Sequence, residues 1–91
     1  MKFTWDEAKN AINAKRHGID FVDAKRIFSG YILTLVDDRI EYGEERYVSF
    51  GLMYGRVIAV VHTESEEEIR IISARKATQN EQKEYFRKIA Y

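Results

Sequence analysis

The chain has 91 residues, as many basic as acidic side chains, and neither cysteine nor proline. This length supports one hydrophobic core and a single domain over residues 1–91, and the lack of cysteine excludes disulfides and thiolate metal sites. The sequence contains no apolar run of about 18 residues and no N-terminal signal pattern, so we expect a cytoplasmic protein without a membrane span.

Charge is unevenly distributed along the chain. Residues 1–30, 31–68 and 69–91 carry net charges of +2, −6 and +4. An acidic middle and a basic end are compatible with a dipolar surface that attracts an anionic partner, although ordinary solvated charge explains the same counts.

The first residues predict a short strand followed by a helix. Phe3 is the centre of the strand, and Thr4 and Glu7 have the spacing of a capping box, so the helix should begin near Asp6 and end at Gly18. Its predicted buried face is formed by Ala8, Ala11 and Ile12.

A second helix is predicted over residues 21–28. Asp20 can cap its start, and Ser29-Gly30 can end it. The apolar side chains that should enter the core from this helix are Phe21, Ala24, Ile27 and Phe28.

From Tyr31 onward the apolar spacing changes from helical to alternating. Four strands fit, namely Ile32 to Val36, Glu45 to Leu52, Arg56 to Thr63 and Ile69 to Lys76. Their short connections favour antiparallel neighbours. The predicted fold class is therefore α+β: a four-stranded antiparallel meander, with a short N-terminal strand, packed with two N-terminal helices and one C-terminal helix.

The last two strands and the final helix place a pair of cations at a helix start. A turn at residues 65–68 would pair Glu64 with Ile69 and Ile58 with Arg75, with His62 on the same face as Arg75. Thr78 and Glu81 form a second capping box, so Arg75 and Lys76 precede the helix directly. The predicted buried side of this helix consists of Gln82, Tyr85, Phe86 and Ile89.

Arg, Lys, His and Glu side chains on the sheet suit a metal-free ribonuclease. Attack of a ribose 2′-hydroxyl on its phosphate requires a base, an acid and cations for the doubly negative transition state. With two histidines and no cysteine, we expect no metal site and no cofactor. The alternative is structural, with Arg46 and Arg75 forming ion pairs with Glu44, Glu45 or Glu64.

Two aromatic side chains and one acidic segment have both structural and functional interpretations. Trp5 either anchors the core between strand and helix or stacks on an RNA base. Tyr85 lies on the inward face of the last helix, where it either packs in the core or reaches the strand end with its hydroxyl. Residues 66–68 are three glutamates, which form a solvated turn and would repel RNA.

Four segments resemble the BrnT family, in order over nearly the whole chain: Phe3–Asp6, Asn13–Phe21, Gly43–Arg46 and Arg70–Ala77. The resemblance implies a RelE-like fold and a metal-independent endoribonuclease toxin of a type II toxin-antitoxin module, which cleaves RNA to inhibit translation and growth. It also implies a BrnA-like ribbon-helix-helix antitoxin as partner, a toxin-antitoxin hetero-oligomer, and contact with DNA only through the antitoxin.

The family positions include several candidate site residues. Of these positions, Arg46, Arg75 and Lys76 are the candidates for phosphate and transition-state contact. Glu44, also a family position, and His62, which is not one, are weaker candidates for proton transfer. The expected RNA contacts are Trp5, Arg70 and Tyr85. Gly18 as a helix stop, Asn13 as a tie to the backbone and Asp6 as a helix-start charge have structural explanations.

One position departs from the family pattern. Many members have an arginine directly after the Thr-Glu of the third long strand, where this chain has Ser65 followed by glutamates. One phosphate contact is then missing, which predicts weaker RNA binding. Two other functions remain open, a non-catalytic antitoxin-binding module and an RNA binder that does not cleave; metal-free RNA cleavage distinguishes them from a nuclease.

Overall fold

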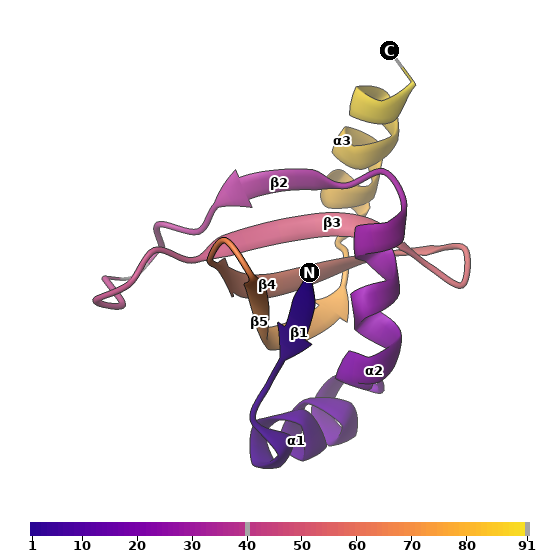
Figure 1. Ribbon diagram of the computed structural model, residues 1–91. Helices are drawn as coiled ribbons and strands as arrows, with labels where there is room; N and C mark the ends of the chain where they lie inside the picture. Colours follow the sequence, from indigo (N-terminus) through magenta and orange to yellow (C-terminus); the bar gives the residue numbers. More distant parts are fainter. Residues whose placement is uncertain (40, 91) are drawn as a thin grey trace.

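A computed structural model describes residues 1–39 and 41–90 and has a mixed α+β fold (Figure 1). In chain order its elements are β1 (Lys2–Thr4), α1 (Glu7–His17), α2 (Phe21–Ala24), the 3-10 helix η1 (Lys25–Ser29), β2 (Leu33–Val36), β3 (Tyr47–Met53), β4 (Arg56–Glu64), β5 (Glu68–Lys76) and α3 (Gln79–Ile89). Within the described ranges, no helix is long and apolar enough to cross a membrane.

The strands form one mixed sheet in the order β1-β5-β4-β3-β2. Strands β2 to β5 each run antiparallel to their chain neighbours, whereas β1 runs parallel to β5 and pairs Phe3 with Ile69. The sequence predicted four paired strands and left the N-terminal strand without a partner. The fifth strand joins because β5 ends the meander with an open edge, and a parallel pairing needs only a long connection between the two strands.

The helices cover the two faces of the sheet unequally (Figure 1). One core lies under α2 and η1, with Phe21 and Ile27 packed against Ile58 and Val60 of β4. A smaller core lies under α3 and is formed by Phe50, Val57, Ala59, Ala77 and Tyr85. The face on the α3 side is therefore only partly covered, which leaves charged side chains there open to solvent.

Helix α1 presents polar side chains to the protein, contrary to the predicted apolar face. Its buried residues are Asn10 and Asn13, while Ile12 is 60 % exposed. Asn13 donates to the carbonyl of Ala74 and accepts from its N–H, at 3.0 and 3.1 Å. The prediction was wrong because α1 lies beside the open edge of β5, whose buried backbone groups require hydrogen bonds that an apolar side chain cannot supply.

The helix ends follow simple capping rules, with one correction. Asp6 caps α1 by accepting from the N–H of Lys9 at 3.0 Å, so the predicted capping box at Thr4 is wrong; Thr4 belongs to β1. Gly18 ends α1 in the left-handed conformation at φ 71°, and Asp20 caps α2, as predicted. The second helix is α-helical for one turn and then continues as the 3-10 helix η1.

A bulge in β5 changes the predicted register. Glu64 pairs with Ile69 as predicted, but Ile58 pairs with Lys76 and not with Arg75. Val61 faces Ser73 while His62 faces Ile71, so Ile72 is the extra residue. Beyond the bulge the faces are exchanged: Arg75 turns toward α3, whereas His62 lies on the other face beneath η1, against Phe28.

Helix α3 begins with the predicted capping box, in which Thr78 and Glu81 bond reciprocally to each other's backbone N–H groups. Of its predicted buried side only Tyr85 is buried, while Phe86 and Ile89 are 47 % and 39 % exposed. Figure 1 shows the reason: the helix contacts the sheet near its start, and its later turns extend past the sheet.

Candidate functional site

Arg75 stands at the end of β5 and holds a carboxylate in its guanidinium fork. Nη1 and Nη2 donate to the two Glu81 oxygens at 2.8 and 3.0 Å, and Nη1 also donates to the Lys76 carbonyl at 3.2 Å. The predicted structural alternative named acidic partners across the sheet, and the actual partner comes from the next helix. About a third of the Arg75 side chain, 32 %, is exposed, so its guanidinium is held in place yet within reach of a ligand.

Glu81 connects this arginine to the start of α3. One of its oxygens accepts from both Arg75 and the backbone N–H of Thr78, each at 2.8 Å. The hydrogen bonds from Arg75, and then those from Thr78, lower the pKa of Glu81 to about 2. The same contact raises the pKa of Arg75. At neutral pH both groups are charged, and a planar anion already occupies the geometry that two phosphate oxygens would take.

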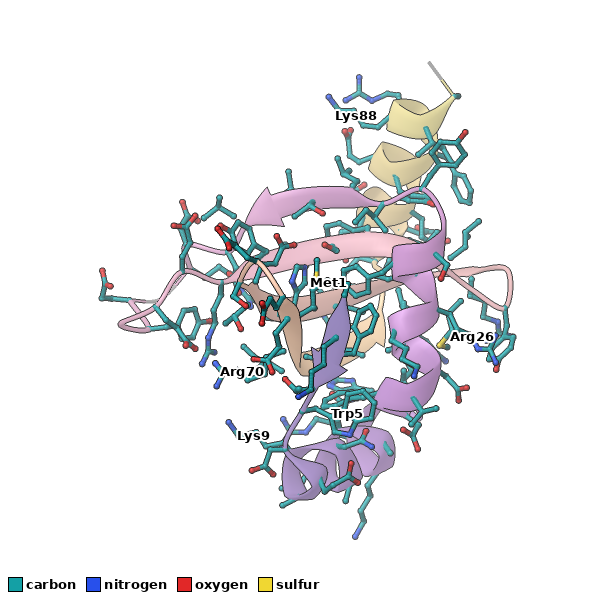
Figure 2. All side chains as sticks on the ribbon, viewed as in Figure 1. Met1, Trp5, Lys9, Arg26, Arg70 and Lys88 are labelled. Atoms are coloured by element: carbon teal, nitrogen blue, oxygen red, sulfur yellow. The ribbon has the colours of Figure 1, made fainter. Side chains whose placement is uncertain are left out.

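A second group of charges lies at the other end of β5, where Figure 2 shows Arg70. Glu44 accepts from Arg46 at 3.1 Å and from Arg70 at 2.8 and 2.9 Å. The Arg46 guanidinium also stacks over the ring of Tyr42 at 3.9 Å. The Arg46 hydrogen bond is the main reason why the pKa of Glu44 is lowered. The expected ion pair between Arg46 and Glu44 is therefore present, and the ion pair between Arg70 and Glu44 ties the loop before β3 to β5.

Asp37 lies between these two groups. Its side chain is almost fully buried and accepts from Arg39 at 2.7 and 2.9 Å. The pKa of Asp37 is lowered mainly by its hydrogen bond from Arg39 and also by the charge of Arg46. The charge of Arg39 lowers the pKa of Arg75, and the charge of Asp37 raises it. We call the combined surface the arginine face. It consists of Arg39, Arg46, Arg70 and Arg75 with Asp37, Glu44 and Glu81.

A hollow of about 180 Å³ opens on the arginine face between the loop after β2 and α3. Val48 and Phe50 of β3 line it, together with Arg39, Arg75 and Glu81. An apolar floor with charged walls suits a nucleotide, because a base can lie on carbon while its phosphate meets arginine.

His62 lies on the opposite face and has no exposed area. Its Nε2 is 2.7 Å from the Ser49 hydroxyl, and its ring stacks on Tyr47. Within residues 1–39 and 41–90 its Nδ1 has no hydrogen-bond partner, and it is 3.7 Å from Glu64. Burial lowers the pKa of His62. The structure therefore separates this candidate for proton transfer from Arg75, and an RNA strand on the surface would not touch it.

The two aromatic candidates also have structural contacts. Trp5 is half-buried, packs edge-on against Phe21 and donates to Glu7 at 2.6 Å (Figure 2). Tyr85 is 1 % exposed and donates its hydroxyl proton to the Tyr31 carbonyl at 2.8 Å, so this hydroxyl does not reach the strand end. Neither ring lies in the hollow beside Arg75.

Lys76 belongs to a separate basic pocket of about 500 Å³ on the other side of Arg75. The pocket is lined by Arg16, His17, Arg75, Lys76 and Thr78. In residues 1–39 and 41–90, no three His, Cys, Asp or Glu side chains gather where they could hold a metal ion.

Sequence reasoning overlooked Arg16, Asp37, Arg39 and Glu81 as members of the site. Glu81 carried a signal, because the capping-box pattern marks it as a helix-start residue, but its second partner depends on the bulge in β5. Asp37 and Arg39 occupy a short acidic turn in the sequence. Their proximity to Arg75 becomes visible only when β2, β3 and β4 are placed side by side.

A family model described as "Ribonuclease toxin, BrnT, of type II toxin-antitoxin system" matches residues 5–81. The matched range contains every residue of the arginine face and ends at Glu81. A search of curated proteins returned no match to the chain.

Proposed function

The chain belongs to the BrnT family of ribonuclease toxins of type II toxin-antitoxin systems, and from this premise we propose a metal-independent endoribonuclease whose reaction takes place at Arg75. The observation that carries this proposal is the bidentate hold of Arg75 on a carboxylate, at 2.8 and 3.0 Å. A phosphodiester has two non-bridging oxygens that fit the same fork. Toxicity would follow from RNA cleavage that stops translation and growth.

The proposed reaction is an internal transesterification. The ribose 2′-oxygen loses its proton to a base and bonds to phosphorus, and the bond from phosphorus to the 5′-oxygen breaks as that oxygen gains a proton from solvent water. Arg75 stabilises the negative charge on the phosphate oxygens, and Lys76 and Arg46 remain the further cations that we assign to phosphate contact. Fixed cations can supply this stabilisation without a metal ion because they are oriented before the substrate arrives.

We assign the base to Glu81. Phosphate binding to Arg75 withdraws the arginine hydrogen bonds that hold the pKa of Glu81 near 2 and adds negative charge nearby. The carboxylate is then both close to the 2′-hydroxyl and more basic. Glu44 is a weaker candidate because two arginines saturate it, and His62 is a weaker one because it is enclosed.

The partner, the fold family and the extent of the domain are also proposals. We infer a BrnA-like ribbon-helix-helix antitoxin, a hetero-oligomer with it, and DNA contact only through it, on the strength of family membership. A RelE-like fold is supported by an antiparallel run of strands with an arginine-rich open face. One domain over residues 1–91 is supported by Tyr85, which lies beyond the matched range yet packs with Phe50 and Ala59. RNA as substrate would place the toxin in the cytoplasm.

The test is RNA cleavage by the purified protein with a metal chelator in excess. Wild-type protein should cut single-stranded RNA, and Arg75→Ala should lower the rate by about 100- to 1,000-fold because one transition-state contact is lost. Arg26→Ala is the matched control, since Arg26 is also an ion-paired, exposed arginine but lies far from the arginine face (Figure 2). RNA left intact by the wild type would exclude the nuclease, and salt-dependent binding without products would favour an RNA-binding module.

A further inference from the structure

The basic pocket beside Arg75 is formed where three elements meet. Arg16 and His17 come from the end of α1, Arg75 and Lys76 from the end of β5, and Thr78 from the cap of α3. Its volume is about 500 Å³. Arg75 is the residue that it shares with the hollow on the arginine face, so the two depressions lie on either side of one guanidinium.

The pocket differs in charge from the arginine face. None of its lining residues is acidic. Among the described parts of the chain, Arg16 and Lys76 form no salt bridge, whereas each arginine of the arginine face is paired with a carboxylate. Arg75 is paired with Glu81, but within the described ranges the charges of Arg16 and Lys76 have no such partner, so the pocket suits a negatively charged group.

Helix stabilisation alone does not explain this arrangement. Basic residues in the last turn of a helix interact favourably with its dipole, and α1 ends with Lys15, Arg16 and His17. That argument applies equally to Lys15, which does not line the pocket, and it does not concern Lys76 on β5. Lys15 is for this reason a suitable control for Arg16.

We propose that this pocket binds the RNA backbone phosphate adjacent to the one cut at Arg75, which rests on the function proposed above. An RNA strand whose scissile phosphate lies in the Arg75 fork must continue on both sides of it. On one side it meets the hollow with its apolar floor, and on the other it meets the uncompensated cations. Contacts of this kind position the strand without reading its sequence.

The test measures binding of the full chain to a 2′-O-methyl RNA oligonucleotide, which lacks the attacking hydroxyl, over a series of salt concentrations. For a single strand, the slope of log affinity against log salt changes by about 0.7 for each phosphate contact. Arg16→Ala should reduce the slope by about that amount and weaken binding. Lys15→Ala should match the wild type, and Arg16→Lys, which keeps the charge, should retain most of the slope.

Thermal unfolding of the Arg16 and Lys15 variants tests whether loss of fold causes any change in RNA binding. The two variants should be equally stable, because each change removes one exposed charge at the end of α1. If Arg16→Ala binds with the slope and affinity of the wild type, or if Lys15→Ala loses as much as Arg16→Ala, the pocket is not a phosphate site. RNA cleavage by the wild type in the same preparation keeps the two proposals distinct. If the wild type cleaves RNA but the slope is unchanged in Arg16→Ala, only the proposal for the pocket is contradicted. If the wild type shows no RNA binding and no cleavage, the proposed nuclease is contradicted as well.

Discussion

Glu81 has two observed contacts and one proposed role, which come from different levels of the structure. As the third residue of α3 it completes the capping box, which the local sequence determines. As the partner of Arg75 it fixes the orientation of a guanidinium on a neighbouring strand. As the proposed base it would take up a proton when phosphate displaces it from that guanidinium. Its depressed pKa is therefore a property of the unliganded site, and substrate should change it.

Glu81→Gln is the residue-scale prediction. Gln keeps the size of the side chain and can still accept one hydrogen bond from Thr78, but it cannot take up the 2′-hydroxyl proton. The single-turnover cleavage rate should fall by about 100- to 10,000-fold, the range of general acid-base contributions, while binding of 2′-O-methyl RNA is kept or improved because a competing anion is gone. Glu84→Gln, a change on the exposed side of the same helix, is the control; a variant at Glu81 that cleaves at the wild-type rate would exclude this base.

At the scale of elements, the fit between η1 and β3 depends on a missing side chain. Gly51 of β3 lies directly under Ile27, and a Cβ added there would be 2.6 Å from the Ile27 Cβ. Such a separation is shorter than van der Waals contact allows, so η1 would have to move away from the sheet. The close approach is what lets the first core form without a long helix above it.

Gly51→Ala should therefore destabilise the fold by about 1–3 kcal/mol, the usual cost of overpacking a core. Urea unfolding followed by far-UV circular dichroism measures this change. Gly30→Ala is the matched control, because Gly30 has open space around its Cα and no positive φ. Equal stability of the two variants would mean that η1 does not rest on β3 as closely as the structure indicates.

At the scale of the whole molecule, global stability should fall in acid in two separate ranges. His62 is buried with its pKa lowered, so the unfolded chain binds its proton more readily than the folded one. The stability that His62 contributes is present above about pH 6.5, the ordinary pKa of histidine. It is lost as the pH falls toward the lower pKa that His62 has in the folded chain. Glu81 acts further down, from its ordinary value of 4.5 to about 2.

Urea unfolding at a series of pH values tests this prediction. The wild type should lose stability below about pH 6.5 and again below pH 4.5. His62→Gln should remove the upper loss, because glutamine does not titrate, and Glu81→Gln should reduce the lower one. The groups that face His62 are Ser49 and Tyr47 of β3, Glu64 of β4 and Phe28 of η1. Glu64 and the backbone of Thr63 favour the protonated ring, but burial outweighs them. A stability profile that is flat from pH 7.5 to 5 would contradict the enclosed histidine.

The local sequence determined the parts of this protein that depend on near neighbours. The αL stop at Gly18, the caps at Asp20 and Thr78, and the hairpin pairing of Glu64 with Ile69 follow from turn chemistry and short connections. The resemblance to the family likewise predicted Arg46 and Arg75 as site residues, and this stays a prediction. These features are readable because each requires only a few consecutive residues to agree.

Tertiary structure alone decided that Arg75 pairs with Glu81 and that Arg70 pairs with Glu44. The bulge at Ile72 turns Arg75 toward Glu81 and away from His62, and the open edge of β5 explains why α1 buries asparagines in place of its alanines. Alternation along a strand predicts faces only until one extra residue reverses them. The periodicity of α1 likewise cannot show that backbone groups of β5 need hydrogen bonds from it, because Ala74 lies about 60 residues away from Asn13 in the sequence.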